Sequence, residues 1–139
     1  CGHIQSPAFQ ENILRMLPIK YTPLNMLLVG IHMYRPKPGI FTKRRRFISA
    51  LKQYLEPYIE TNCAVIGDFN KPFRAYIEFD SLRPYFVPLI PENNERIDFC
   101  LVTTLLKSMN PFVTYDDDIV HRYNTTDHPA ITLTIPATQ

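Results

Sequence analysis

The sequence predicts a single domain of the α/β class. Its 139 residues are enough to bury one hydrophobic core. Hydrophobic residues make up 45% of the chain and charged residues 20%, which is typical of a globular protein and excludes a disordered one. Short apolar segments with the length of buried strands alternate with segments that have helical periodicity, and this alternation indicates the α/β class.

The first half of the chain predicts strands and two helices. Residues 1–5 could form a strand, and Ser6-Pro7 predicts the start of a helix whose apolar stripe ends at Pro18. A strand is expected over residues 25–34, buried on both faces until its polar end. An amphipathic helix is expected over residues 42–60, and Pro57 could bend or shorten it.

The second half predicts further strands at residues 63–67, 96–102 and 130–135. Residues 71–95 are rich in proline and are expected to be irregular, apart from a short helix near residues 80–83. Residues 103–109 could form a helical turn, and residues 111–123 a strand or an extended segment.

Several classes of protein are disfavoured by composition. No apolar run approaches the roughly 18 residues that a membrane span needs, and no signal-peptide pattern is present. The chain has 3 cysteines, and none lies in a C-x-x-C pair, which argues against a disulfide framework and a zinc site. We therefore expect an intracellular, reducing compartment, either nuclear or cytoplasmic.

Basic residues are concentrated in one short segment, although the net charge is only +2. This basic segment contains Arg35, Lys37, Lys43, Arg44, Arg45 and Arg46. It could be a solvated helix start or a site for a polyanion such as nucleic acid. Cations near a helix N-terminus oppose the helix dipole by about 0.3–1 kcal/mol each, so fold stability does not explain their position.

Polar residues also gather at the ends of the predicted buried strands. They are His32 and Tyr34, then Asp68 and Asn70, then Asp98, and finally Asp127 and His128. Strand ends can converge at one edge of a sheet, which would bring these side chains together. Such a set could support metal-assisted hydrolysis of a phosphate ester.

The chemistry assigns a role to each group of that set. A carboxylate such as Asp127 could hold a hard divalent cation, and His128 could take a proton from water. Asp98 could fix the tautomer of His128, and we predict that the two form a hydrogen-bonded pair. A tyrosine hydroxyl or a second histidine could stabilise the charge that develops.

Each motif also has a purely structural interpretation. Gly67-Asp-Phe-Asn70 is an acceptable turn, and Asp127-His128 could be a loop before a strand. Asp98 lies in an apolar strand, where an unpaired carboxylate is costly, so it could form an ion pair with Arg96 or Lys107 instead. Cys63 and Cys100 are most simply small core residues.

Taken in order, these motifs resemble the endonuclease/exonuclease/phosphatase superfamily, which is DNase I-like. Gly67-Asp-Phe-Asn70 is similar to its GDFN motif, Arg96-Ile-Asp98 to RID, and Thr126-Asp127-His128 to SDH with Thr in place of Ser. Tyr34-Arg35-Pro36 resembles the Y-x-P of retrotransposon-type endonucleases. Either His32 or Tyr34 could fill the position at the end of that strand.

The resemblance implies an α/β sandwich of two mainly antiparallel β-sheets flanked by helices. It also implies cleavage of a phosphodiester or phosphomonoester that depends on Mg²⁺, with Mn²⁺ as an alternative. Carried over by motif, Asp68 and Asn70 would position the attacking water and the phosphate, with Asp68 close to the metal. Asp127 would bind the metal, Asp98 would support His128, and His128 would be the general base.

The match extends over nearly all of this chain but only over the later part of a family domain. Members normally begin with a strand that bears an Asn and later a Glu metal ligand, and residues 1–31 offer no such pair. We therefore expect residues 1–139 to form one DNase I-like domain that is incomplete at its N-terminus. It could be a fragment of a longer enzyme, be completed by a second chain or a homo-oligomer, or be a degenerate member.

The leading functional hypothesis is a DNA endonuclease-type domain with little or no activity in this chain alone. DNA would be bound through Arg35, Lys43, Arg44, Arg45 and Arg46. The alternatives are an inactive binding or structural module of the same fold, and a phosphatase that acts on a phosphorylated lipid or another small phosphoester.

Overall fold

The computed structural model describes residues 12, 15–74, 76–90, 96–116 and 130–137. A five-stranded sheet in the order β1-β2-β3-β5-β4 forms the centre of the molecule. Its strands are β1 (Met16–Tyr21), β2 (Met26–His32), β3 (Asn62–Asp68), β4 (Phe86–Leu89) and β5 (Asp98–Thr103). Strands β2 and β3 are parallel, and the other neighbours are antiparallel.

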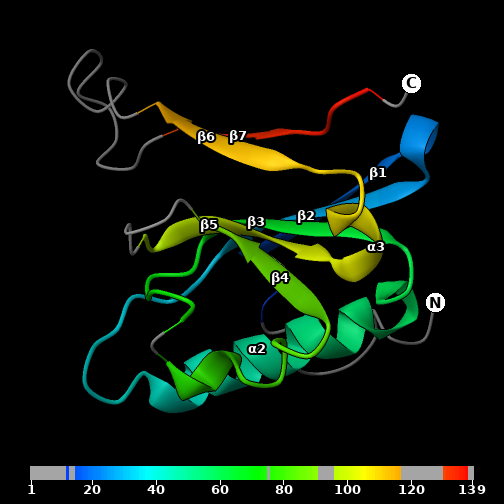
Figure 1. Cartoon of the computed structure of the whole chain (residues 1–139). Helices are drawn as coiled ribbons and strands as arrows, with labels where there is room; N and C mark the ends of the chain where they lie inside the picture. The colour runs from blue at the N-terminus through cyan, green and yellow to red at the C-terminus, as the bar shows by residue number, and fades with distance from the viewer. Residues whose placement is uncertain (1–11, 13–14, 75, 91–95, 117–129, 138–139) are drawn as a thin grey trace.

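A second sheet consists of the antiparallel strands β6 (Phe112–Asp116) and β7 (Ala130–Thr134). The helices are α2 (Phe41–Leu55) and α3 (Thr104–Lys107), and the 3₁₀ turns are η3 (Thr22–Leu24), η4 (Glu56–Tyr58) and η5 (Ile77–Phe79). Figure 1 shows the five-stranded sheet as the middle layer, with α2 on one side and β6–β7 on the other.

Each face of the five-stranded sheet packs against a different layer. Val29, Val65 and Leu101 contribute to a core with Phe47 and other residues of α2. Residues on the opposite face, including Ala64, Cys100 and Val102, form a second core with residues of β6 and β7. Side chains alternate between these two faces along each strand, so every central strand is apolar on both sides. The expectation of two mainly antiparallel sheets in an α/β sandwich is confirmed.

The edge strands differ from the predictions. The prediction that a helix extends to Pro18 is wrong, because Met16–Tyr21 form β1 instead. β1 is an edge strand, which tolerates Pro18, and the side chain of Leu17 is 63% exposed rather than in the core. The opposite edge strand β4 was not predicted, since it is short and contains Pro88.

The inner elements agree more closely with the predictions. The strands expected at residues 25–34, 63–67, 96–102 and 130–135 are confirmed within a few residues. Helix α2 ends at Leu55 rather than near residue 60. Pro57 follows in η4, and because proline has no backbone N–H it cannot continue the hydrogen bonding of α2. The short helix expected near residues 80–83 is a turn, and η5 precedes it.

Two further predictions are only partly testable. The segment expected to be extended over residues 111–123 contains β6 up to Asp116, and the rest lies outside the described residues. The predicted strand at residues 1–5 and helix start at Ser6-Pro7 also lie outside them. Within the described part of the chain, no helix is long and apolar enough to cross a membrane.

Candidate active site

Three neighbouring strands place a polar residue at the same edge of the five-stranded sheet. His32 ends β2, Asp68 ends β3 and Asp98 begins β5. His32 pairs with Asp68 in the register of β2 and β3, and Asp68 pairs with Asp98 in the register of β3 and β5. The sheet therefore aligns these residues in one row, which we call the acidic row.

The acidic row faces the β6–β7 layer. Residues two positions apart in a strand lie on the same face of the sheet, so Asp68 shares a face with Ile66, and Asp98 with Cys100. Ile66 and Cys100 pack in the core beneath β6 and β7. The hydroxyl of Tyr115 in β6 donates to the backbone oxygen of Asp98 at 2.7 Å. This bond fixes β6 to the edge of the sheet that carries the acidic row.

The two carboxylates of the acidic row are buried. Asp68 is 9% exposed and Asp98 8% exposed, whereas the side chain of His32 is 64% exposed. His32 Nε2 lies 3.8 Å from Asp68 Oδ2. Like charges directly opposite each other on antiparallel strands destabilise a sheet, and burial adds to that cost. Positive charge near this edge would offset it.

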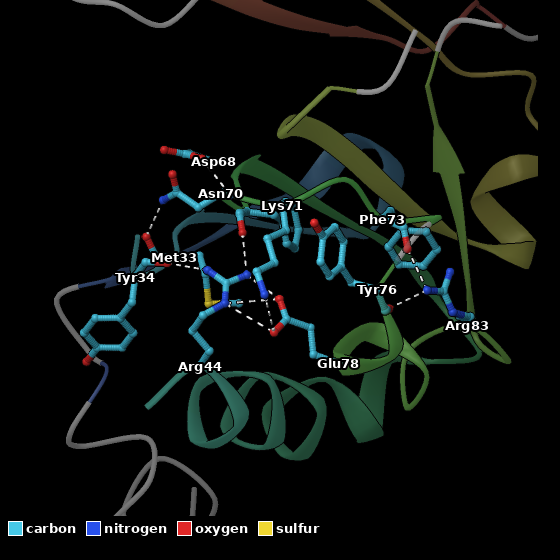
Figure 2. Close-up of polar contacts among 11 residues, drawn as sticks. Met33, Tyr34, Arg44, Asp68, Asn70, Lys71, Phe73, Tyr76, Glu78 and Arg83 are labelled. Carbon is cyan, nitrogen blue, oxygen red and sulfur yellow. Dashed lines mark hydrogen bonds and ion pairs between the residues drawn. The ribbon is translucent and has the colours of Figure 1, made fainter. Parts of the chain in front are cut away.

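Asn70 holds the chain that follows Asp68 in a tight turn. Its φ angle is +57°, a left-handed conformation that Asn tolerates better than most residues. Its backbone N–H donates to Asp68 Oδ1 at 2.8 Å, and its side-chain Nδ2 donates to the backbone oxygen of Met33 at 2.7 Å. The turn thus orients one carboxylate oxygen of Asp68 and ties the end of β3 to the end of β2 (Figure 2).

Gly67 and Phe69 complete the geometry of this motif. Gly67 has a φ angle of +149°, and a Cβ atom at this position would lie 2.1 Å from the backbone oxygen of Ile31. Phe69 is fully buried, with its ring stacked on that of Phe99 at a centroid distance of 4.2 Å. The segment is therefore a structural turn that at the same time presents Asp68 at the sheet edge.

His32 rather than Tyr34 lies next to Asp68. Either residue was expected to fill this position, but β2 ends at His32, and the alternation of side chains along the strand ends with it. The Tyr34 ring packs edge-on against Phe47 at a centroid distance of 6.3 Å, and its hydroxyl donates to Asn12 Oδ1 at 3.0 Å. In Figure 2 the Tyr34 side chain points away from Asp68 and Asn70.

One predicted phosphate ligand proves to be buried. Arg44 is 1% exposed, and its guanidinium forms an ion pair with Glu78, so the prediction that it binds a polyanion at the surface is wrong. The cause is the amphipathic pattern of α2, in which Arg44 shares the buried face with Phe47 and Ile48. The other cations proposed for this role are exposed, namely Arg35, Lys43, Arg45 and Arg46.

The remaining predictions for the site concern residues outside the described part of the chain. Asp127 and His128 are among these, and so is the expected pair of Asp98 with His128. Within the described residues, no group of three or more His, Cys, Asp or Glu side chains could hold a metal ion. Asp68 is the described member of the predicted metal-binding pair.

The alternative partner Lys107 is disfavoured for Asp98. Lys107 ends α3, which follows the far end of β5, whereas Asp98 begins that strand. Tyr115 and Glu78 were not predicted as site residues. Tyr115 is separated from the motifs in the sequence, and no local pattern indicates that its hydroxyl reaches Asp98.

The two described cysteines, Cys63 and Cys100, are buried in the core. Burial raises the pKa of Cys63 and of Cys100 to about 12, so both thiols stay protonated at neutral pH. Both lie in the sheet and are fully buried. Their interpretation as small core residues is confirmed.

Comparison with known proteins identifies the fold. No family model matches the chain, and no curated protein matches its sequence. Among solved structures, an AP endonuclease from Archaeoglobus fulgidus aligns with a TM-score of 0.70 at 12% identity, over 96% of this chain and 68% of that one. A 3'-5' exonuclease (NExo) from Neisseria meningitidis aligns with a TM-score of 0.64 at 13% identity, over 87% of this chain and 64% of that one.

A third solved structure comes from a mobile element. The endonuclease domain of TRAS1, a telomere-specific non-LTR retrotransposon, aligns with a TM-score of 0.57 at 14% identity, over 89% of this chain and 70% of that one. All three have the DNase I-like fold, and the alignments span about two thirds of each. The predicted DNase I-like fold is thereby confirmed, as part of such a domain.

Proposed function

We propose that this chain forms part of a metal-dependent phosphodiester hydrolase domain that acts on DNA. The observation that carries the proposal is the acidic row, in which the buried carboxylates of Asp68 and Asp98 lie opposite each other on adjacent strands. This arrangement is unfavourable for a sheet that serves only as a scaffold. It is well suited to a site where a cation and a phosphate are bound.

The proposed roles follow from the chemistry of each side chain. Asp68 and Asp127 offer the oxygen ligands that Mg²⁺ or Mn²⁺ prefers. The bound ion would supply positive charge to the phosphate oxygens and lower the pKa of water. Asp68 and Asn70 orient the water and the phosphate, and Asp98 accepts a hydrogen bond from His128. His128 takes the proton from the attacking water.

Three features support DNA as the substrate. The loop that follows His32 leads directly to the N-terminus of α2, so exposed cations of the basic segment lie close in sequence to the acidic row. Exposed Lys and Arg side chains bind the phosphates of a nucleic acid backbone without regard to sequence. The three similar structures are, by name, an AP endonuclease, an exonuclease and a retrotransposon endonuclease.

Nicking of supercoiled plasmid tests the proposal. The native protein that contains these residues is incubated with plasmid in Mg²⁺ and in EDTA. We expect nicking only with Mg²⁺, and a fall in rate of more than about 100-fold for Asp68→Asn and for His128→Ala. Glu60→Gln is the control, since Glu60 is exposed in the turn before β3, at the opposite end of that strand.

The same preparation separates the alternatives. Nicking that persists in EDTA and in His128→Ala would overturn the proposal. Mg²⁺-dependent release of phosphate from a phosphoinositide, without nicking, would assign the site to a lipid phosphatase. Absence of turnover on both substrates would favour the binding module.

A further inference from the structure

Arg44 differs from its neighbours in the basic segment. All cations of residues 35–46 are described, and Arg44 alone is buried. The side chain of its partner Glu78 is only 3% exposed, and Lys71 Nζ lies 3.8 Å from Glu78 Oε2. Removing charges from water is costly, so this pair requires good geometry and further hydrogen bonds.

The guanidinium of Arg44 finds those hydrogen bonds on two separate segments of the backbone. Nη2 donates to the backbone oxygen of Phe69 at 3.0 Å, and Nη1 donates to that of Tyr34. Nε lies 3.1 and 3.3 Å from the two carboxylate oxygens of Glu78, and Nη2 also contacts this carboxylate. Figure 2 shows the guanidinium between these acceptors, and we call them together the Arg44 cluster.

The two acceptor segments carry the proposed site. Tyr34 lies two residues after His32, and Phe69 lies between Asp68 and Asn70. The same segments are joined directly by the bond from Met33 N–H to the Asp68 backbone oxygen at 2.8 Å. Asn70 Nδ2 adds a second direct bond, to the backbone oxygen of Met33. Arg44, which lies in α2, adds a third connection by donating to both segments.

We propose that Arg44 is a positioning residue that sets the spacing between the ends of β2 and β3, and hence the geometry of His32, Asp68 and Asn70. The role in turnover rests on the proposed function, whereas the role in spacing does not. Arginine suits it because a planar fork of N–H groups can serve a carboxylate and two carbonyls at once. A lysine at the same position could keep the charge opposite Glu78 but could not bind all three.

A second arginine provides a matched control. Arg83 pairs with Asp80 at 2.7 Å and donates through Nη2 to the backbone oxygens of Phe73 and Tyr76 at 2.6 and 2.7 Å. It therefore joins one carboxylate and two carbonyls, as Arg44 does. Its acceptors belong to the segment after residue 72, and Figure 2 places them away from Asp68 and Asn70.

The test compares Arg44→Lys with Arg83→Lys by amide hydrogen exchange and by plasmid nicking in the native protein. In Arg44→Lys we expect exchange of the Met33 and Asn70 amides to rise roughly tenfold relative to that of Val65 in mid-strand. We expect kcat to fall roughly 10- to 100-fold while KM for plasmid changes little, because a displaced site slows the reaction more than binding. Arg83→Lys should leave both the relative exchange and kcat unchanged.

Other outcomes would overturn the proposal. An equal rise in exchange at Met33, Asn70 and Val65 would mean that Arg44 contributes only to global stability. A higher KM with unchanged kcat would make Arg44 a phosphate contact. If Arg44→Lys does not fold, Glu78→Gln is the second variant: it leaves the fork of Arg44 in place but removes the charge that holds it, so the same local rise in exchange at Met33 and Asn70 is expected, smaller in size. If the unaltered protein does not nick plasmid but the change in exchange is local, the proposed function fails and the spacing role stands.

Discussion

The two ends of the five-stranded sheet both carry polar side chains, but of different chemical kinds. At one end lies the acidic row, with the carboxylates of Asp68 and Asp98 opposite each other. At the other end lie the neutral residues Asn62 and Thr103, at the start of β3 and the end of β5. Both ends are close to the core, and both contain buried polar groups.

Most polar groups of the neutral end are hydrogen-bonded within the protein, although the buried Oδ1 of Asn62 has no hydrogen-bond partner among the described residues. The Thr103 hydroxyl donates to the backbone oxygen of Thr61 at 2.6 Å and accepts from the backbone N–H of Cys63 at 3.2 Å. It also caps α3 by accepting from Leu106 N–H. Asn62 Nδ2 donates to the backbone oxygen of Leu24 at 3.0 Å. These hydrogen bonds stabilise the fold, whereas two carboxylates opposite each other on adjacent strands repel each other, and this is the chemical difference between the two ends.

The largest expected effect on stability comes from Gly67, which precedes Asp68. Gly67→Ala would place Cβ against the backbone oxygen of Ile31, which cannot give way without shifting β2. We expect a loss of roughly 3 kcal/mol or more in the free energy of unfolding, measured by urea denaturation.

The control for that prediction is Gly39→Ala. Gly39 also has a positive φ angle, of +81°, but a Cβ atom there would have no neighbour within 4 Å. We expect a loss of about 1 kcal/mol. Equal losses of unfolding free energy in the two variants would contradict the close contact between Gly67 in β3 and the backbone of Ile31 in β2.

Thr103→Val tests the opposite end of the sheet. It keeps the shape of the side chain but removes the hydroxyl from Thr61, Cys63 and Leu106, which leaves buried backbone groups without a partner. We expect a loss of about 1–3 kcal/mol in unfolding free energy, with an unchanged rate of plasmid nicking. A lower nicking rate under conditions in which Thr103→Val is fully folded would contradict the claim that only the acidic end of the sheet takes part in the reaction.

The smallest expected effect concerns the exposed cations of the basic segment. Arg45→Ala should weaken DNA binding and reduce the slope of log K against log salt by about 0.9 if it contacts one phosphate. Lys20→Ala is the control, because Lys20 is exposed in β1 near Thr61, at the neutral end of the sheet. A fluorescence-anisotropy titration at several salt concentrations measures both variants, and equal slopes for them would argue against the basic segment as the DNA contact.

Much of the fold could be predicted from the sequence because the central strands are apolar on both faces. Periodicity was sufficient for β2, β3, β5 and β7, and the order of the motifs indicated the DNase I-like fold. The edge strands β1 and β4 were less predictable. Each is paired on one side only and contains a proline, and the exposed apolar residues of β1 resemble part of a helical stripe.

The alignment of polar residues at one end of the sheet could be predicted from the sequence, but the geometry of their side chains could not. Strand ends indicated His32, Asp68 and Asp98, since the pairing of neighbouring strands aligns residues that end or begin them. The burial of Arg44 could not be predicted from a run of basic residues, because it depends on Glu78, which is distant in sequence. The orientation of Tyr34 depends on where β2 ends, which periodicity does not determine.

Paramagnetic broadening by Mn²⁺ tests the central claim, that the acidic row marks the metal-binding end of the sheet. Substoichiometric Mn²⁺ is added to ¹⁵N-labelled protein, and the amide signals at the two ends are compared. We predict selective loss of the signals of Asp68, Asn70 and Asp98, with those of Asn62 and Thr103 retained, and no selective loss in Asp68→Asn. Equal broadening at both ends, or the same selective loss in Asp68→Asn, would contradict the account.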